Sequence, residues 1–228
     1  MKCLVVVAHP VDEILGAGAT IHKLTSQKIQ VDICILCSQA QARFDRPDDD
    51  TLRKNLMMAN LAVGSTHVYM GDYADSHLST APHLEVVQYI EKVICSSQAT
   101  HIITHHPGDL NSDHKVTSMC CQEASRISLR KSRKDAPQVK CIAYMEVPSS
   151  TDWGLDTSTH TFRPNTFVNV GLDGVQAKIM ALRQYKGVMR PFPHPRCKEV
   201  IQGLAAVRGG QSGCEYAEAF ETAWRVVE

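Results

Sequence analysis

The sequence lacks several features that would place it in a large functional class. It has no excess of charge of one sign, because 24 basic residues balance 24 acidic residues. Its most basic run, Arg130 to Lys134, is short, which argues against nucleic acid or an anionic membrane as the main partner. No apolar run approaches the roughly 20 residues of a membrane span. The apolar N-terminal run is too short for a signal peptide.

The sequence also lacks the dinucleotide-binding fingerprint. The first apolar run, Leu4 to Val7, is followed by a histidine and two acids, and the glycines Gly16 and Gly18 come only after them. A G-x-G-x-x-G at the end of the strand would be needed for a nucleotide enzyme of the Rossmann type. We therefore set that class aside.

The nine cysteines, in a chain with no secretion signal, indicate reduced thiols and a cytoplasmic location. Cys34 and Cys37 form a C-x-x-C, but they lie inside the strand-like run VDICILC. Residues three apart on a strand point to opposite faces of the sheet. We interpret these cysteines as core residues and not as a redox or zinc pair.

Strand-like and helix-like segments alternate along roughly the first 145 residues, which predicts a parallel α/β sheet with crossover helices. We expect a Rossmann-like, doubly wound, mostly parallel sheet of strand order 3-2-1-4-5, in a single domain of residues 1–228 with an irregular C-terminal extension. The strands are expected at 4–7, 31–37, 67–70, 101–105, 139–145 and 166–170. Helices are expected at 14–27, 51–63, 84–95, 115–129, 175–185 and 196–207, and RGGQSG is expected to end the last of them.

Polar side chains follow the first expected strand directly. His9 and Asp12 lie three residues apart across a turn that Pro10 stiffens, so both could hold one metal ion. The alternative is that Asp12 is a helix N-cap and that His9 merely ends the strand. Two ligands alone do not make a metal site.

A second polar cluster, HHPGDLNSDH, follows the fourth expected strand. In the expected strand order the first and fourth strands are neighbours, and the order reverses between them, which is where open α/β sheets bind their ligands. His9, Asp12 and His114 would then form a plausible catalytic zinc site with an open fourth position. His105, the last residue of its strand, is expected to pack or to bond to the backbone.

These residues carry a resemblance to a known family. AHPVDEILGAGAT resembles the AHPDDExxGxGGT signature of the PIG-L/LmbE family of zinc-dependent deacetylases, and HHPGDLNSDH resembles its second motif, HPxDxNxDH. Weaker similarities at RKNLMMANLAVG, EVPSSTDWG and RGGQSGCEYAEAF follow in the order of the family, so the resemblance covers nearly the whole chain. It implies a Zn²⁺-dependent hydrolase, with other divalent metals also usable, that removes an N-acetyl group from an amino sugar, nucleotide-sugar or glycoconjugate. By this similarity His9, Asp12 and His114 correspond to the metal ligands.

The largest departure from the family lies at Val11, where the family places its general base, an aspartate. Valine cannot accept a proton, so a contribution of roughly 10²- to 10⁴-fold to the rate should be missing. Either the base was replaced deliberately, or the chain is a natural variant that uses another group or has lost catalysis. Asp113 and Glu13 are the nearest substitute carboxylates. We therefore expect weak activity or none, and the alternative function is a non-catalytic sugar- or metal-binding protein.

Other positions are predicted to support the site. Asn111 stands where some members have a histidine; it can donate a hydrogen bond but cannot act as an acid. His194 is then our candidate for that role. Arg53 and Arg196 are candidates for substrate binding. Two aspartates are expected to orient the histidine ligands, with Asp113 the stronger candidate of Asp109 and Asp113. The expected partner is a small-molecule N-acetylated sugar or sugar conjugate, and a homo-oligomer is compatible with the sequence.

Overall fold

The computed structural model describes residues 1–39, 48–130, 135–155 and 161–227, so most of the basic run at 130–134 lies outside the described residues. Its centre is a seven-stranded sheet of order β3-β2-β1-β4-β5-β7-β6. The strands are β1 (Lys2–Val7), β2 (Gln30–Gln39), β3 (Val68–Ala74), β4 (His101–His105), β5 (Cys141–Met145), β6 (Thr166–Asn169) and β7 (Ala217–Arg225). The neighbouring pairs among β1 to β5 are parallel, and β7 runs antiparallel to both β5 and β6. The predicted α/β class and the order 3-2-1-4-5 are confirmed.

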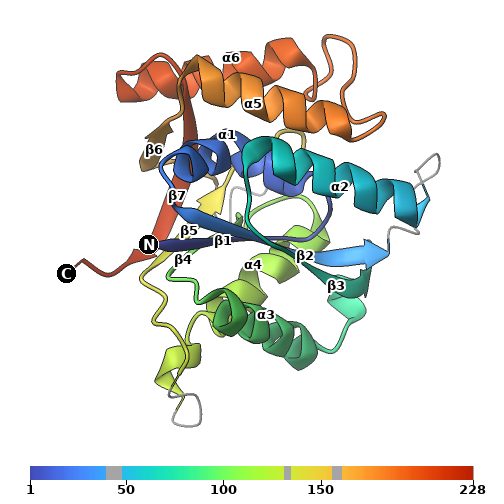
Figure 1. Ribbon diagram of the computed structural model, residues 1–228, viewed down its shortest axis with the longest axis vertical. Coiled ribbons are helices and arrows are strands. Elements are labelled where there is room, and N and C mark those ends of the chain that lie inside the picture. The colour runs from blue at the N-terminus through green and yellow to red at the C-terminus, as the bar shows by residue number, and fades with distance from the viewer. Residues whose placement is uncertain (40–47, 131–134, 156–160, 228) are drawn as a thin grey trace.

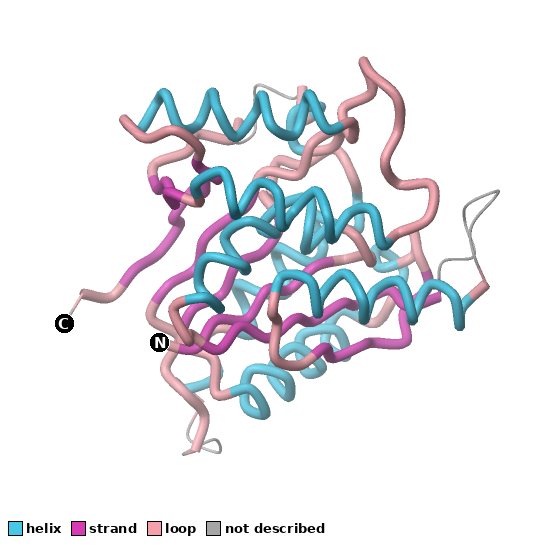
Figure 2. The backbone as a smooth tube through the Cα atoms, turned by 45° about the horizontal axis from the view of Figure 1, so that its top comes forward, coloured by secondary structure: helices cyan, strands magenta, loops and turns pink. Residues whose placement is uncertain are grey.

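Helices cover both faces of the sheet (Figures 1 and 2). On one side lie α1 (Asp12–Ser26), α2 (Asp49–Val63) and α5 (Gly171–Gln184), with α6 (Lys198–Ser212) beside α5. On the other side lie α3 (His83–Ser97) and α4 (Ser112–Ala124). Each face has its own buried apolar cluster. Strand β1 contributes Val5 and Val7 to one cluster and Leu4 and Val6 to the other, which explains its unbroken apolar sequence.

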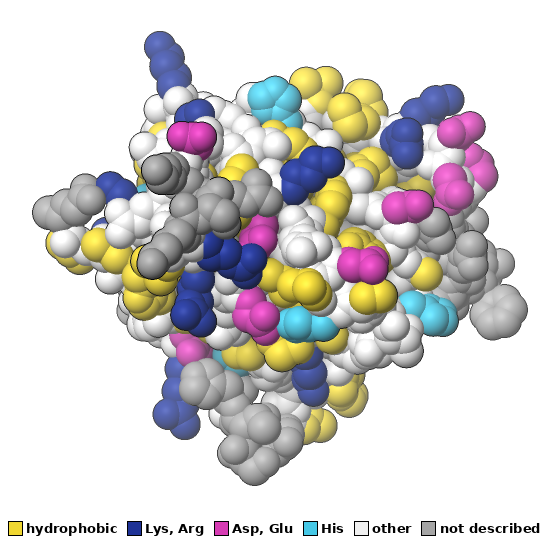
Figure 3. Space-filling model, turned by 90° about the horizontal axis from the view of Figure 1, so that it is seen from below, with side chains coloured by type: hydrophobic (Ala, Val, Ile, Leu, Met, Phe, Trp, Pro, Cys, Tyr) yellow, Lys and Arg dark blue, Asp and Glu magenta, His cyan; other side chains and the backbone are white. Residues whose placement is uncertain are grey.

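Charge is spread evenly over the face that Figure 3 shows. There, basic and acidic side chains of the described residues alternate with hydrophobic ones. This distribution agrees with the balanced composition of the chain. Among the described residues, no helix combines the length and the apolar character needed to cross a bilayer.

Several expected boundaries were wrong, most clearly those of α4 and α6. The helix expected at 115–129 is α4, which begins earlier because the side-chain oxygen of Asn111 accepts from the Asp113 N–H at 2.8 Å. It ends at Ala124, and Ile127–Leu129 forms a separate 3-10 turn. The segment RGGQSG lies mostly inside α6, which ends at Ser212 and has Gly213 as its C-cap, at a positive φ of 75°. A Cβ on Gly209 would overlap the Glu215 carbonyl oxygen, so this glycine permits close packing and does not end the helix.

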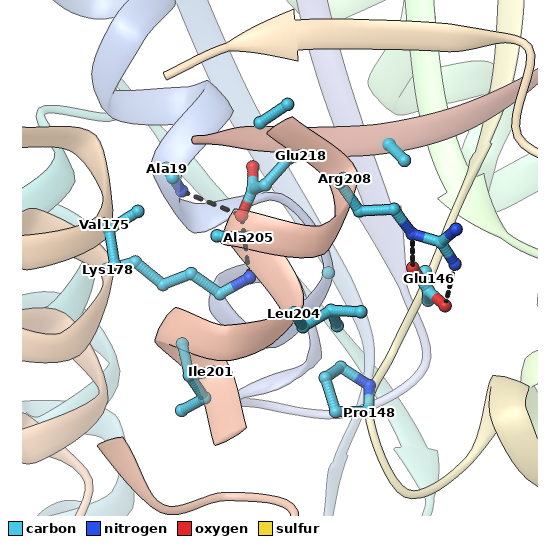
Figure 4. A pocket seen from close by; sticks show the side chains of 13 residues that line it. Ala19, Glu146, Pro148, Val175, Lys178, Ile201, Leu204, Ala205, Arg208 and Glu218 are labelled. Atoms are coloured by element: carbon cyan, nitrogen blue, oxygen red, sulfur yellow. Dashed lines mark hydrogen bonds and ion pairs between the residues drawn. The ribbon is translucent and has the colours of Figure 1, made fainter. Parts of the chain in front are cut away.

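A buried ion pair joins three elements of the fold (Figure 4). Lys178 of α5 lies 2.7 Å from an oxygen of Glu218 on β7, and both residues are buried. The Glu218 carboxylate also accepts from the backbone N–H groups of Ala19 (3.1 Å) and Thr20 (2.6 Å) inside α1. The pair therefore fixes α1, which carries Asp12, against α5 and β7.

Replacing Glu218 by alanine is expected to lower the free energy of unfolding by about 3–5 kcal/mol, because it leaves the Lys178 ammonium buried and unpaired. Urea unfolding measures this loss. The matched control is Glu215→Ala, at an exposed position two residues away from the strand, with an expected change within about 0.5 kcal/mol. Equal losses in the two variants would contradict a specific role for the ion pair.

Candidate metal centre

Three buried side chains converge at the carboxyl edge of the sheet. The Asp12 Oδ2 atom lies 3.2 Å from Nδ1 of His9 and 3.1 Å from Nε2 of His114. One ligand atom from each of the three residues lies within 4.8 Å of the others. The segments meet because β1 and β4 are hydrogen-bonded neighbours, and the polar residues follow the end of each strand. The sheet thus brings together residues about a hundred positions apart in the chain.

The turn from β1 into α1 sets the positions of His9 and Asp12. Val11 is the N-cap residue of α1, and Asp12 is the first residue of the helix, so the interpretation of Asp12 as the N-cap was wrong. The Asp12 carboxylate instead accepts from the His9 backbone N–H at 3.1 Å. Val11 has a φ of 91°, in a region that β-branched residues rarely adopt.

Each histidine turns its second ring nitrogen toward a carboxylate. Nε2 of His9 lies 3.0 Å from Asp113 and 3.2 Å from Asp75, and Nδ1 of His114 lies 3.1 Å from Asp109. Such carboxylates fix the tautomer and the orientation of metal-binding imidazoles. Asp113 is adjacent to His114 in the sequence, but its carboxylate contacts the ring of His9 and not that of His114. The arrangement leaves Nδ1 of His9 and Nε2 of His114 facing Asp12.

Backbone and hydroxyl groups hold these two carboxylates in place. Asp113 accepts from the backbone N–H groups of Ser76 (2.6 Å) and Leu78 (3.1 Å). Asp109 accepts from the hydroxyls of Ser150 and Thr151, and from the Asn111 N–H at 2.9 Å. The support behind the two histidines therefore comes from the segments after β3, β4 and β5.

The charged groups of the cluster shift one another's pKa. Burial alone would lower the pKa of His114, but the Asp12 charge and the hydrogen bond to Asp109 outweigh it and raise that pKa to about 9. Burial would raise the pKa of Asp109, but His114 lowers it to about 2. The pKa of His9 is likewise raised, against the effect of burial, by Asp113 and Asp12. Protons on the histidines thus compensate the carboxylates when no cation is bound.

These pKa shifts predict that the stability of the protein and its affinity for zinc both depend on pH. The folded pKa of His114 is raised from 6.5 to about 9, so its stabilising contribution is full below pH 6.5 and is lost as pH rises through about 9. In a chelator, the free energy of unfolding should fall over this interval. Zinc affinity should rise over the same interval, because the ligands must lose their protons to bind metal. Urea unfolding and zinc titration at both ends of the interval test this, and a flat pair of profiles would contradict the assigned coupling.

His105 is buried, and it bonds to the backbone. Its Nε2 accepts from the Ala8 N–H at 2.9 Å, and its ring stacks on that of His114 with centroids 3.7 Å apart. Burial, followed by the charge of His114, lowers the pKa of His105. It therefore supports His114 as a neutral packing partner.

The remaining candidates make other contacts than with the three converging side chains. Asn111 caps α4 with its side-chain oxygen. His194 is exposed, and its Nδ1 accepts from the Arg196 N–H at 3.0 Å; Arg53 lies exposed on α2. Within the described residues, neither His194 nor Arg53 makes a hydrogen bond or an ion pair with His9, Asp12 or His114. Their expected roles stay predictions.

Sequence reasoning missed three of the residues that surround the histidines. Asp75 follows β3, and the topology places the end of that strand at the same sheet edge, so its position offered a signal. Ser150 and Thr151 lie in the segment EVPSSTDWG, whose sequence shows a weak similarity to the family but assigns no role to either residue. The identity of their partner, Asp109, follows only from the structure.

A family model described as PIG-L, GlcNAc-PI de-N-acetylase, matches residues 4–125. The chain belongs to the PIG-L family. The match includes both polar segments that form the cluster, so the resemblance of the two motifs to this family is confirmed. No curated protein sequence matches the chain.

Solved structures with this PIG-L fold include deacetylases and a hydratase. GalB, the 4-carboxy-2-hydroxymuconate hydratase from Pseudomonas putida, is 22% identical with a TM-score of 0.79, covering 100% of this chain and 99% of its own. N,N'-diacetylchitobiose deacetylase from Pyrococcus horikoshii is 20% identical with a TM-score of 0.76, covering 97% and 83%. The zinc-inhibited form of teicoplanin deacetylase Orf2 is 16% identical with a TM-score of 0.68, covering 100% and 98%. At these identities the likeness shows the fold.

Proposed function

We propose that this PIG-L chain is a metal-dependent hydrolase that removes an N-acetyl group from an amino sugar, nucleotide-sugar or glycoconjugate, and that Val11 leaves it weakly active or inactive. The observation that carries the proposal is the convergence of His9 Nδ1, Asp12 Oδ2 and His114 Nε2 on one point. The similar deacetylases and the family match support the reaction class.

The donor set fits zinc. Two imidazole nitrogens and one carboxylate oxygen are the ligands of many catalytic zinc sites, which keep a fourth position open. His9, Asp12 and His114 would hold the ion, with Asp113 and Asp109 behind the two rings. When bound, the ion would polarise the amide carbonyl of the substrate and lower the pKa of a coordinated water to about 7.

The carboxylates near Val11 are already engaged, which supports the loss of the general base. The Glu13 side chain is buried, and its Oε1 accepts from Tyr185 (2.6 Å) and Asn60 (3.1 Å), on elements away from His9. Asp113 contacts His9 and two backbone N–H groups. In our proposal neither replaces the base.

The function is tested by measuring bound zinc and acetate release from a panel of N-acetylated sugars and sugar conjugates. Hydration of an unsaturated hydroxy acid should be assayed separately, because one similar structure is a hydratase. One equivalent of zinc with acetate release from a Val11→Asp variant is the expected result. A chain that binds no divalent metal would refute the proposal.

The second candidate, a sugar- or metal-binding protein without catalysis, is favoured by Val11. It predicts that calorimetry detects sugar binding while both the parent chain and the Val11→Asp variant release no acetate.

We also propose a cytoplasmic location, since all nine cysteines are free thiols.

His194→Ala, made in the Val11→Asp background, is expected to lower turnover by about 10²-fold or more, as for loss of a general acid, with unchanged zinc content. Acetate release and metal analysis measure the two quantities. The control is His67→Ala, a histidine whose side chain is 61% exposed and which contacts Asp32. If turnover were unchanged, His194 would be an ordinary loop residue.

A further inference from the structure

The turn between the two N-terminal ligand candidates is strained and needs support from elsewhere. Val11, between His9 and Asp12, combines a φ of 91° with a ψ of −35° and has no side-chain cap hydrogen bond. A β-branched residue at positive φ is a true outlier, and such strain persists only where the surrounding structure enforces it. Something outside the turn must therefore hold residue 11 in place.

Tyr185 lies where that support is needed. It directly follows α5, some 170 residues along the chain, and it shares one buried cluster with Val11. Its hydroxyl donates to Glu13 Oε1 at 2.6 Å. The tyrosine thus bonds to the residue after Asp12 and lies in the same apolar cluster as the residue before it.

The network around Glu13 is closed to water. Glu13 and Tyr185 are 0% and 2% exposed, and Asn60 of α2 gives Glu13 its second donor at 3.1 Å. Within the described residues, Glu13 Oε2 is buried with no hydrogen-bond partner. Since no solvent can replace a lost donor there, removal of the Tyr185 hydroxyl changes the turn directly.

We propose that Tyr185 is a positioning residue of the metal centre: its hydroxyl, bonded to Glu13 in the first turn of α1, holds that turn and with it the left-handed conformation at residue 11 that aims His9 and Asp12 at one point. This inference rests on the proposed function. It assigns to α5 and the C-terminal third of the chain a role in a site whose ligands all lie before residue 115.

The test is zinc affinity in Tyr185→Phe, which removes only the hydroxyl. The dissociation constant for zinc should rise at least about tenfold, as for other groups that orient metal ligands. The matched control is Tyr216→Phe, whose hydroxyl accepts from Gln202 at 3.2 Å near α6 and β7; its zinc affinity should equal that of the parent. A merely structural role for Tyr185 would lower the unfolding midpoint and leave the zinc affinity of the folded protein unchanged.

A double-mutant cycle with Val11→Gly tests whether Tyr185 affects zinc binding through the backbone conformation of residue 11. Glycine adopts a φ of 91° without strain, so in the Val11→Gly background Tyr185→Phe should change zinc affinity by less than about threefold. An equal loss in both backgrounds would overturn the proposal. If Tyr185→Phe alone does not fold, recovery of folding and zinc binding in the double variant supports it, and failure of both overturns it.

Zinc binding by the parent chain distinguishes failure of the proposed metal centre from failure of the proposed role of Tyr185. A parent that binds no zinc refutes the metal centre and this inference with it. A parent that binds one zinc, with Tyr185→Phe binding equally well, refutes only the role of Tyr185.

Discussion

Replacing Val11 by aspartate is expected to raise acetate release from the correct N-acetyl substrate by about 10²- to 10⁴-fold over the parent chain. The aspartate would supply the proton acceptor that the family places at this position, next to a site whose three ligand candidates are intact. The backbone also favours the change. At a φ of 91° aspartate is better tolerated than valine, which offsets part of the cost of placing a carboxylate at this buried position.

Val11→Asn is the matched control for this experiment. Asparagine has the size of aspartate and the same tolerance for positive φ, but it cannot accept a proton at neutral pH. It should therefore share any gain in stability and show none of the gain in turnover. Equal activity in the two variants would mean that strain, and not the missing base, limits the parent. No activity in the aspartate variant on any substrate would favour the binding function.

Loss of stoichiometric zinc binding is expected in His114→Ala and in Asp12→Ala. Asp12 Oδ2 lies 3.1 Å from His114 and 3.2 Å from His9, so each substitution removes one of the three proposed ligand atoms. Metal analysis after dialysis against zinc measures the effect. Asp109→Asn keeps all three ligands and should weaken zinc binding by about 10- to 100-fold. This smaller loss distinguishes a residue that orients a ligand from a ligand itself. One equivalent of zinc retained in both ligand variants would refute the ligand set.

The parallel part of the fold could be predicted because its strands are apolar and its helices have apolar residues at helical spacing. Leu4 to Val7 is buried on both faces, and this pattern is typical of a central parallel strand. The C-terminal strand β7 was not predicted, because AEAFETAW contains the buried Glu218, whose partner Lys178 lies on another element. Local pattern cannot reveal a long-range ion pair.

The ligand set could be predicted because topology alone brings the ends of β1 and β4 together. What could not be predicted are contacts that depend on backbone conformation. The positive φ of Val11 follows from no residue preference, since valine disfavours it. The contact of Asp113 with His9 depends on the direction of one side chain at the start of α4. The position of Tyr185 depends on how α5 packs beside α1.

The convergence of the two segments is tested most directly by the anomalous difference map of a zinc-soaked crystal. Our account predicts one strong peak about 2.0–2.2 Å from each of His9 Nδ1, Asp12 Oδ2 and His114 Nε2. A zinc ion bound elsewhere, with these three atoms uncoordinated, would contradict it.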